Sequence, residues 1–192
     1  MGEPLLNLPN VVEAVRIFLD QKTFAIASKR INVSTSGVLS KIPALLESVP
    51  VNLALSLHAT TDKVRDVLVP LNKKFPLASV MQELKNNPMI TKRRPVFFEY
   101  TLLEGVNDSP EDASRLVRLL KKLPAKLNVI PVNPHPASAY KRPSEAVINR
   151  FMKELAKGNF PITLRKSRGS DIDAACGQLA TRKQVDGLLE LQ

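Results

Sequence analysis

Segments with the apolar period of a β-strand alternate along this chain with segments that have the period of an α-helix. In Val51–Leu57, every second residue is a large aliphatic side chain, which is typical of a half-buried strand. Leu116, Leu119, Leu120 and Leu123 instead follow the spacing of one helix face. Strands that alternate with helices form βα units, and their one-handed crossovers imply parallel strands. The sequence therefore predicts an α/β fold with a parallel sheet.

The same patterns give approximate limits for each element. Strands are expected at Ile31–Ser34, Val51–Leu57, Pro95–Leu103, Lys126–Pro131 and Pro161–Arg165. Helices are expected over the stripe Val11, Val15, Phe18 and Leu19, over Val38, Ile42, Leu45 and Leu46, around Val64–Leu68, around Leu77–Leu84 with Pro76 in its first turn, and at Val185–Leu191. Another helix is expected to start at Ser109 as its cap, with Pro110 at the first position and the acids Glu111 and Asp112 in the first turn. Ser144 is expected to cap a further helix, which Gly158 ends. Four or five strands are too few to close an eight-stranded barrel, so we expect a partial barrel with an open edge.

Composition narrows the classes of function. A chain of 192 residues fits one domain, and its 28 Lys and Arg against 18 Asp and Glu give a net charge of +10. Such a charge indicates a phosphate-backbone partner or a solvated basic surface, and charge alone does not separate the two. The apolar runs are far shorter than the roughly 20 residues of a membrane span, and residues 1–10 lack the pattern of a secretory signal. A single cysteine excludes an internal disulfide and a cysteine-ligated cluster held by this chain alone.

Polar residues occupy one face of several expected strands, where a fully buried parallel sheet would carry apolar side chains. These residues are Asn52 and Ser56, Glu99 and Thr101, and Asn128. As a set they indicate a wet or ligand-filled concave face, although any one of them fits an individually satisfied core group.

Polar groups also follow the strands, at the edge where parallel sheets bind ligands. They lie in Ser34–Gly37, Ser56–His58, Glu104–Asp108 and Pro131–Pro134. Hydroxyl, imidazole and amide groups suit a polar small molecule, and neither a dinucleotide fingerprint nor a P-loop occurs. A metal site built on His58 and His135 is unsupported because neither has a close second ligand, and a lone histidine after a strand is more often structural than catalytic.

Six blocks carry a resemblance to a known family. They are Met1–Asn7, Ser34–Gly37, Ser56–His58, Phe98–Tyr100 with Gly105–Asp108, Pro131–Pro134, and the long block Arg168–Ala180 around Cys176. In this order they resemble the RlmN/Cfr family of radical S-adenosylmethionine (SAM) RNA methyltransferases. The resemblance covers nearly the whole chain and implies the carboxy-terminal portion of a partial (βα)6, TIM-like radical SAM barrel. Residues 1–160 would be barrel strands and helices, and residues 161–192 an extension that carries the cysteine.

The resemblance also implies site residues and cofactors. SAM would be held by Gly2, Glu3, Ser34, Ser56, Leu57, His58 and Asn133. Cys176 would be the methyl-carrying S-methylcysteine, and Arg165, Lys166 and Arg168 would lie near the RNA. A [4Fe–4S] cluster is implied as well, but its Cys-x-x-x-Cys-x-x-Cys loop and the family's second cysteine do not occur in this sequence. No metal-binding residue is assigned.

The family's chemistry implies how these groups act. An adenine carbon is a poor nucleophile, so the thiolate of Cys176 is methylated first, and nearby Arg168 would favour the thiolate. A radical derived from a second SAM then takes hydrogen from that methyl group, which adds to an adenine of RNA. We expect carbon 2 of adenine in 23S-type rRNA and tRNA, on resemblance alone, with carbon 8 left open.

Three interpretations remain open. The chain is a portion of an RNA methyltransferase that is inactive by itself, a non-catalytic relic that binds RNA or the ribosome, or a generic nucleotide-binding α/β domain. RNA is the expected partner, with no membrane and a monomeric state. The expected location is the cytoplasm, or a plastid or mitochondrion if a missing amino-terminal part carries a transit peptide. Ser170 and Val132 depart from the family's usual residues, which bears on RNA contacts more than on SAM.

Overall fold

The computed structural model describes residues 2–133 and 139–165, which form a sheet of five parallel strands in the order β1-β2-β3-β4-β5. Each strand is therefore a sequence neighbour of the strand beside it, as successive βα units require. The strands are β1 Asn32–Thr35, β2 Asn52–Ser56, β3 Val96–Leu102, β4 Ala125–Pro131 and β5 Ile162–Leu164. This result confirms the predicted α/β fold with parallel strands.

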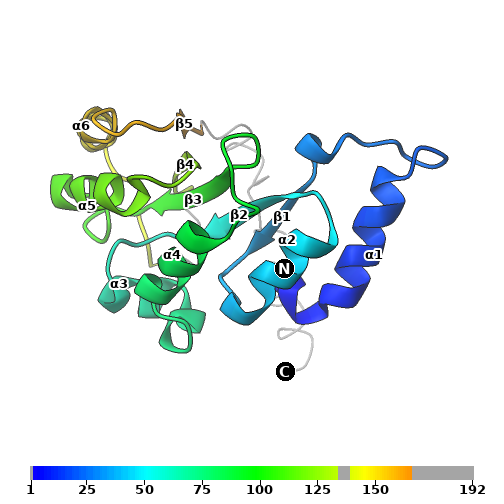
Figure 1. Ribbon diagram of the computed structural model, residues 1–192. Coiled ribbons are helices and arrows are strands. Elements are labelled where there is room, and N and C mark those ends of the chain that lie inside the picture. The colour runs from blue at the N-terminus through cyan, green and yellow to red at the C-terminus, as the bar shows by residue number, and fades with distance from the viewer. Residues whose placement is uncertain (1, 134–138, 166–192) are drawn as a thin grey trace, which may run out of the picture.

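Helices follow the strands and cover one face of the sheet (Figure 1). The α-helices are α1 Leu8–Leu19, α2 Ile42–Ser48, α3 Asp62–Leu68, α4 Leu77–Asn86, α5 Pro110–Leu120 and α6 Glu145–Leu155. Short 3-10 helices lie at η1 Pro4–Asn7, η2 Ser28–Arg30, η3 Leu39–Lys41 and η4 Pro70–Lys73. None of the helices in the described part of the chain has the length and apolar character of a membrane span.

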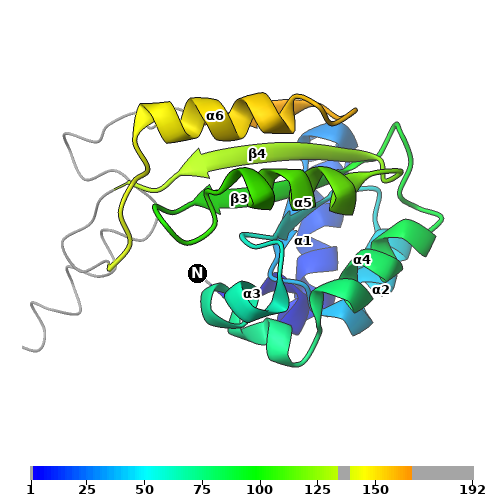
Figure 2. The same cartoon turned by 90° about the vertical axis from the view of Figure 1, so that its left-hand side faces the viewer.

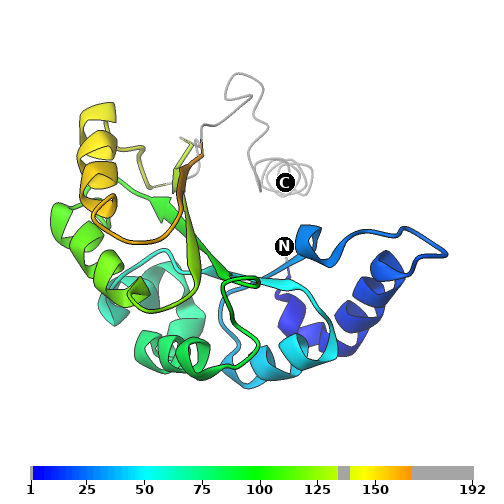
Figure 3. The same cartoon turned by 45° about the horizontal axis from the view of Figure 1, so that its top comes forward.

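The sheet curves into a crescent with the helices on its convex side (Figure 3). In β3 the residues facing the helices are buried, while Phe97, Glu99 and Thr101 on the other face are half-buried. Tyr100 of β3 stacks on Phe151 of α6 with ring centroids 5.7 Å apart. The hydrophobic core therefore lies between the sheet and the helices, and the concave face carries the polar residues. Figure 2 shows α6 and α5 lying along the strands that they cover.

The two outer strands give the crescent its open ends. Among the described residues, β1 pairs only with β2, and β5 pairs only with β4. A free parallel edge exposes unpaired backbone donors and acceptors. The fold is thus a partial barrel with open edges, as the sequence predicts.

Two helix starts confirm their predicted caps. The Ser109 hydroxyl oxygen accepts a hydrogen bond from the amide of Asp112 at 3.0 Å, and Pro110 opens α5. Ser144 caps α6 by accepting from the amide of Val147 at 3.4 Å. Such caps satisfy amides that have no partner inside the helix.

Several predicted limits are wrong by a few residues. Val38 precedes η3 and lies outside α2, since Pro43 in the first turn fixes the helix start at Ile42. Pro76 is the cap of α4 and not part of its first turn. The expected apolar stripe of α1 is wrong at Phe18, which is 40% exposed and contacts Phe24 edge-on. The helix expected at Val185–Leu191 lies outside the described residues.

Candidate functional site

The carboxyl ends of the strands form one polar edge of the sheet. Register places Thr35 of β1 beside Leu55 of β2, and Ser56 beside Glu99 of β3. The Val132 amide, just beyond β4, donates to the Leu102 carbonyl at 3.1 Å. The ends of four neighbouring strands therefore lie side by side. Five of the seven predicted SAM-binding residues lie in the last residues of these strands or just beyond them: Ser34, Ser56, Leu57, His58 and Asn133.

Glu3 brings the amino-terminal segment to this edge. Its Oε1 accepts from the Thr35 hydroxyl at 2.8 Å, and its Oε2 accepts from the Ser36 amide at 2.8 Å. The same carboxylate caps η1 through the Leu5 amide at 3.1 Å. Gly2 beside it is exposed, with no atom within 4 Å of the position that a Cβ would take. The Gly-Glu pair thus leaves open space for a ligand next to a fixed carboxylate.

The buried side chain of Arg65, in α3, holds the ends of β1 and β2 together. Its guanidinium donates to the carbonyls of Leu57 at 3.1 Å, Ser36 at 2.9 Å and Ser56 at 3.0 Å. The residue is 1% exposed, and burial lowers its pKa against the opposing effect of nearby carboxylates. A buried fork of donors of this kind fixes the backbone of both strand ends in one geometry.

Asn72 connects Arg65 to negative charge. Its Oδ1 accepts from Arg65 at 2.8 Å, and its Nδ2 donates to Asp62 at 2.8 Å and Asp66 at 2.6 Å. Asp62 also accepts from the Leu77 amide at 2.8 Å, and these two bonds hold its pKa below the ordinary value. Among the described residues Arg65 forms no direct ion pair. Asn72 bridges it to Asp62 and Asp66, whose negative charges favour the protonated guanidinium.

His58 follows β2 in a left-handed backbone conformation, with a φ of 54°. Its Nδ1 accepts from the Thr101 amide at 3.0 Å, so the neutral ring carries its proton on Nε2. Burial, and secondarily the charge of Arg65, lower the pKa of His58 to about 4. At neutral pH His58 thus offers a neutral N–H donor, which has no protein partner within the described residues.

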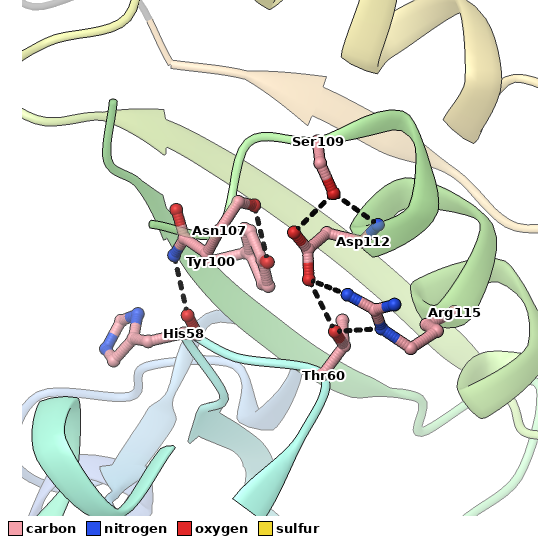
Figure 4. Close-up of polar contacts among 7 residues, drawn as sticks. All are labelled: His58, Thr60, Tyr100, Asn107, Ser109, Asp112 and Arg115. Atoms are coloured by element: carbon pink, nitrogen blue, oxygen red, sulfur yellow. Dashed lines mark hydrogen bonds and ion pairs between the residues drawn. The ribbon is translucent and has the colours of Figure 1, made fainter. Parts of the chain in front are cut away.

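A second network holds the loop after β3 (Figure 4). Asn107 donates to the His58 carbonyl at 2.7 Å and to the Thr101 carbonyl at 2.8 Å. The Tyr100 hydroxyl donates to the Asn107 carbonyl at 2.8 Å, and burial raises the Tyr100 pKa well above its ordinary value. Asn107 therefore locks the turn at His58 to the end of β3.

Asp112 extends this network to the segment after β2 (Figure 4). Its carboxylate accepts from the Thr60 hydroxyl at 2.8 Å and from Ser109 at 2.7 Å. Arg115 donates to Asp112 at 2.5 Å and to Thr60 at 3.0 Å. These bonds join the first turn of α5 to Thr60, two residues after His58, and so stabilise the segment that follows β2.

The concave face next to this edge carries further polar side chains. Ser34 is exposed there and Ser56 is half-buried. Glu99 accepts from the Asn128 side chain at 3.1 Å across neighbouring strands. Asn52 is 6% exposed and donates to the Lys29 carbonyl at 3.0 Å, so it is a satisfied structural group and not part of an open surface. The expectation of a wet concave face therefore fits Ser34, Ser56, Glu99, Thr101 and Asn128 better than Asn52.

The remaining predicted site residues fall into three situations. Leu57 is completely buried, with its amide bonded to Glu99 and its carbonyl to Arg65, so its side chain belongs to the core. Asn133 is half-buried beyond β4, and Arg165 is exposed beyond β5 with its amide on the Val129 carbonyl. Cys176, Lys166, Arg168 and His135 lie outside the described residues.

The donor set of this edge fits SAM. A fixed carboxylate at Glu3 suits an ammonium group, and the hydroxyls of Ser34 and Ser56 with the His58 N–H suit ribose and carboxylate oxygens. A [4Fe–4S] cluster does not fit, since the chain has one cysteine and the described residues hold no group of three potential metal ligands.

Sequence reasoning missed the residues that brace this edge: Arg65, Asn72, Thr35, Asn107 and Asp112. Arg65 sits in a short amphipathic helix, where an arginine normally indicates the solvent side. Two signals were available, because Thr35 and Asn107 both belong to strand-end blocks that the resemblance already includes.

Curated relatives match this chain closely over part of their length. The dual-specificity RNA methyltransferase RlmN of Methylocella silvestris is 47% identical over 184 residues, which are 96% of this chain and 46% of the relative. The protein of the same name from Pseudomonas putida strain W619 is 47% identical over 180 residues, or 93% of this chain and 47% of the relative. The chain thus spans about half the length of the curated relatives that it matches. No family model matches it.

Solved structures agree. A radical SAM methyltransferase from Sphaerobacter thermophilus has a TM-score of 0.85 and 43% identity, covering 93% of this chain and 52% of that structure. A domain of pyruvate-formate lyase-activating enzyme from Bacteroides vulgatus has a TM-score of 0.66 at 18% identity, covering 86% of this chain and 96% of that domain, and shares the fold alone.

The fold is that of a radical SAM methyltransferase. Within that class, the chain is similar to the curated RlmN proteins over nearly all of its own length and about half of theirs. The resemblance stated from sequence is confirmed, whereas the roles of individual residues remain predictions.

Proposed function

We propose that this chain forms the SAM-binding and methyl-accepting part of an RNA methyltransferase of the RlmN type. One observation carries the proposal: Glu3 is fixed on the end of β1, within the edge that also holds Ser56, His58 and Asn133. A carboxylate placed beside open space at a strand end is the expected arrangement for an amino-acid ligand.

Each residue at the edge has a distinct part in this proposal. Glu3 with Gly2 receives the ammonium end of SAM, and Ser34, Ser56 and Asn133 supply hydrogen bonds to its polar groups. His58 donates from Nε2, which its bond with Thr101 keeps protonated. Leu57 contributes through the fixed course of the backbone, because its side chain lies in the core. Arg65 and Asn107 are positioning residues that hold this backbone in place.

Bound SAM would supply the methyl group. Cys176 is the proposed acceptor because a thiolate is a strong nucleophile and the chain has no other cysteine. Arg168 stands eight residues before Cys176 in the sequence, and we propose that its charge favours the thiolate form.

The radical part of the reaction needs groups that this chain lacks. One cysteine cannot ligate a four-iron cluster, so we propose that the chain alone is inactive in methylating RNA. Reconstitution with iron and sulfide is accordingly expected to leave no bound cluster on the isolated chain.

The proposed substrate is an adenine of RNA, methylated on carbon 2 in rRNA and tRNA. Support comes from the relatives named dual-specificity RNA methyltransferases and from the net charge of +10. The choice of carbon 2 over carbon 8 rests on the family resemblance.

SAM binding by equilibrium dialysis tests the proposal, with Glu3→Gln compared with Glu13→Gln. Glu13 is an exposed residue of α1 that matches Glu3 in charge and size. We expect Glu3→Gln to weaken binding at least about tenfold, a loss of about 1.4 kcal/mol, because it removes the carboxylate charge. Glu13→Gln is expected to bind as the unmodified chain does. Equal affinities for the two variants would contradict the site.

A non-catalytic RNA-binding role is the second candidate. It is favoured by the lack of cluster ligands together with the net charge of +10. It predicts RNA binding by a chain that does not bind SAM, so the same dialysis experiment separates the two functions.

A further inference from the structure

A basic cavity lies at the opposite end of the sheet from the candidate SAM site. It has a volume of about 750 Å³ and is enclosed by the segments that precede β3, β4 and β5. Six cationic side chains line it: Lys92, Arg118, Lys121, Lys122, Lys126 and Lys157. None of the sixteen described residues that line it is acidic. We call it the lower groove.

The cations of the lower groove are largely uncompensated. Lys157 pairs with Glu154, whereas the other five form no ion pair within the described residues. Lys126 lies with its ammonium 5.0 Å from the centre of the Phe97 ring, which leaves its charge available. Like charges gathered around a concavity repel one another and raise the local concentration of anions. This arrangement is therefore complementary to a polyanion.

The lower groove also contains an aromatic side chain. Phe160 is half-buried in its lining, and its ring lies over Gly158, where a Cβ would come within 2.6 Å of Phe160 Cε1. The absence of a side chain at Gly158 permits this approach, and the Phe160 ring also packs against the hydrophobic core. Cations beside an aromatic platform are the combination by which proteins bind single-stranded nucleic acid.

The backbone at Lys122 supports a role for the charge. Lys122 has a φ of 67°, in the left-handed region that glycine adopts without strain. Lys122 lies in the turn between α5 and β4, where a glycine would adopt this backbone conformation with less strain. A strained lysine at the rim of a basic cavity points to a function for its ammonium group.

We propose that the lower groove binds a single-stranded stretch of RNA, with phosphates on the lysines and a base on Phe160. The seven residues of β4 separate this groove from the SAM edge by about 20 Å. The RNA would thus contact the protein at two ends of the sheet. The identity of the polyanion as RNA rests on the proposed function, but the location of this contact does not.

Binding of a fluorescent single-stranded RNA of about 12 nucleotides, followed by anisotropy at several salt concentrations, tests this proposal. The test variant of the full chain combines Lys92→Gln, Lys121→Gln and Lys122→Gln. The control combines Lys22→Gln, Lys63→Gln and Lys85→Gln, which are exposed, lie outside the groove and remove the same charge. We expect the test variant to bind RNA at least tenfold more weakly. The slope of log affinity against log salt concentration should fall in magnitude by about 2, because each lost phosphate contact removes about 0.7. The control is expected to change affinity less than about threefold.

One single substitution separates weaker RNA binding from damage to the fold, and a second tests the aromatic contact. Lys122→Gly relieves the left-handed strain, so its thermal midpoint should equal or exceed that of the unmodified chain while RNA binding weakens. Phe160→Leu should weaken binding about tenfold, whereas Phe24→Leu at an exposed site elsewhere should not.

The outcomes separate this proposal from the proposed function. The lower groove would be overturned as an RNA site if the test and control triple variants lost RNA affinity equally. Unchanged RNA binding by Lys122→Gly would overturn it as well. RNA binding that is absent even in the unmodified chain would overturn both the groove and the RNA substrate, and SAM dialysis would then still report on the SAM edge. If the chain does not bind SAM while its RNA affinity still depends on the lysines of the lower groove, only the SAM site is overturned.

Discussion

At the scale of single residues, Arg65 is the group on which the site edge depends most. Its guanidinium satisfies three backbone carbonyls from the ends of β1 and β2 and one amide oxygen. A lysine keeps the charge but cannot reach this many acceptors, because its donors leave from a single atom. The buried carbonyls would then lack partners.

We predict that Arg65→Lys lowers the free energy of unfolding by about 3 kcal/mol. Arg16→Lys is the matched control, since Arg16 is exposed on α1 and forms a long ion pair with Glu13 at 3.7 Å. Chemical denaturation of the two variants measures the difference. A loss below about 0.5 kcal/mol for Arg65→Lys, as for ordinary surface changes, would refute the role given to this residue.

His58 gives the site edge a dependence on pH. Its folded pKa of about 4 lies below the unfolded value of 6.5, so the unfolded chain binds the additional proton between these values. The contribution of the neutral His58 ring to the free energy of unfolding is therefore fully present above pH 6.5, and it is lost as the pH falls towards 4. The contribution is on the order of 3 kcal/mol.

The variant His58→Asn tests this effect, because asparagine tolerates a positive φ and has no ionisable group. Between pH 6.5 and pH 4 the unmodified chain should lose more stability than the variant, by up to about 3 kcal/mol. Carboxylates titrate in both chains and cancel in the comparison. Parallel stability curves would show that His58 is not the titrating group.

At the scale of elements, α5 shows what local sequence determines. Ser109, Pro110 and two acidic residues predict its start, and the structure confirms Ser109 as the cap. Ser109 also donates to Asp112 at 2.7 Å, so the cap orients the carboxylate that holds Thr60. Capping and bracing of the site edge are therefore one feature.

Ser109→Ala is predicted to cost about 1 kcal/mol of unfolding free energy, with Ser79→Ala as the control. Ser79 is exposed within α4, where alanine is a better helix former. Thermal and chemical unfolding of both variants measure the effect. Equal stability of the two would mean that the cap does not support α5.

The strands and helices followed from sequence because their apolar periods reflect which face is buried. Phe18 departs from this rule because α1 has no strand beyond it to cover its outer side within the described residues. The bracing contacts of Arg65 and Asn107 could not be predicted, since they join residues brought together only by the crossovers between strands. The predicted ligand residues were found through the family resemblance and through their place at strand ends.

At the scale of the whole molecule, the crescent presents two chemically different ends. The carboxyl ends of the strands carry Glu3 and His58 in a hydrogen-bonded frame, and the amino ends carry the basic lower groove. In parallel α/β proteins the first of these ends is the one that binds small ligands. We therefore propose that SAM binds at the first end, and that RNA phosphates contact both the lower groove and the exposed Arg165.

A titration of the isotope-labelled chain with SAM, followed by amide chemical shifts in NMR, tests this assignment most directly. We predict concentration-dependent shifts at Gly2, Ser36, His58, Thr101 and Asn133, because their amides lie along one edge. Amides of the lower groove, such as Lys122 and Asn159, should stay unchanged. Shifts confined to the lower groove, or no shifts at millimolar SAM, would contradict the account.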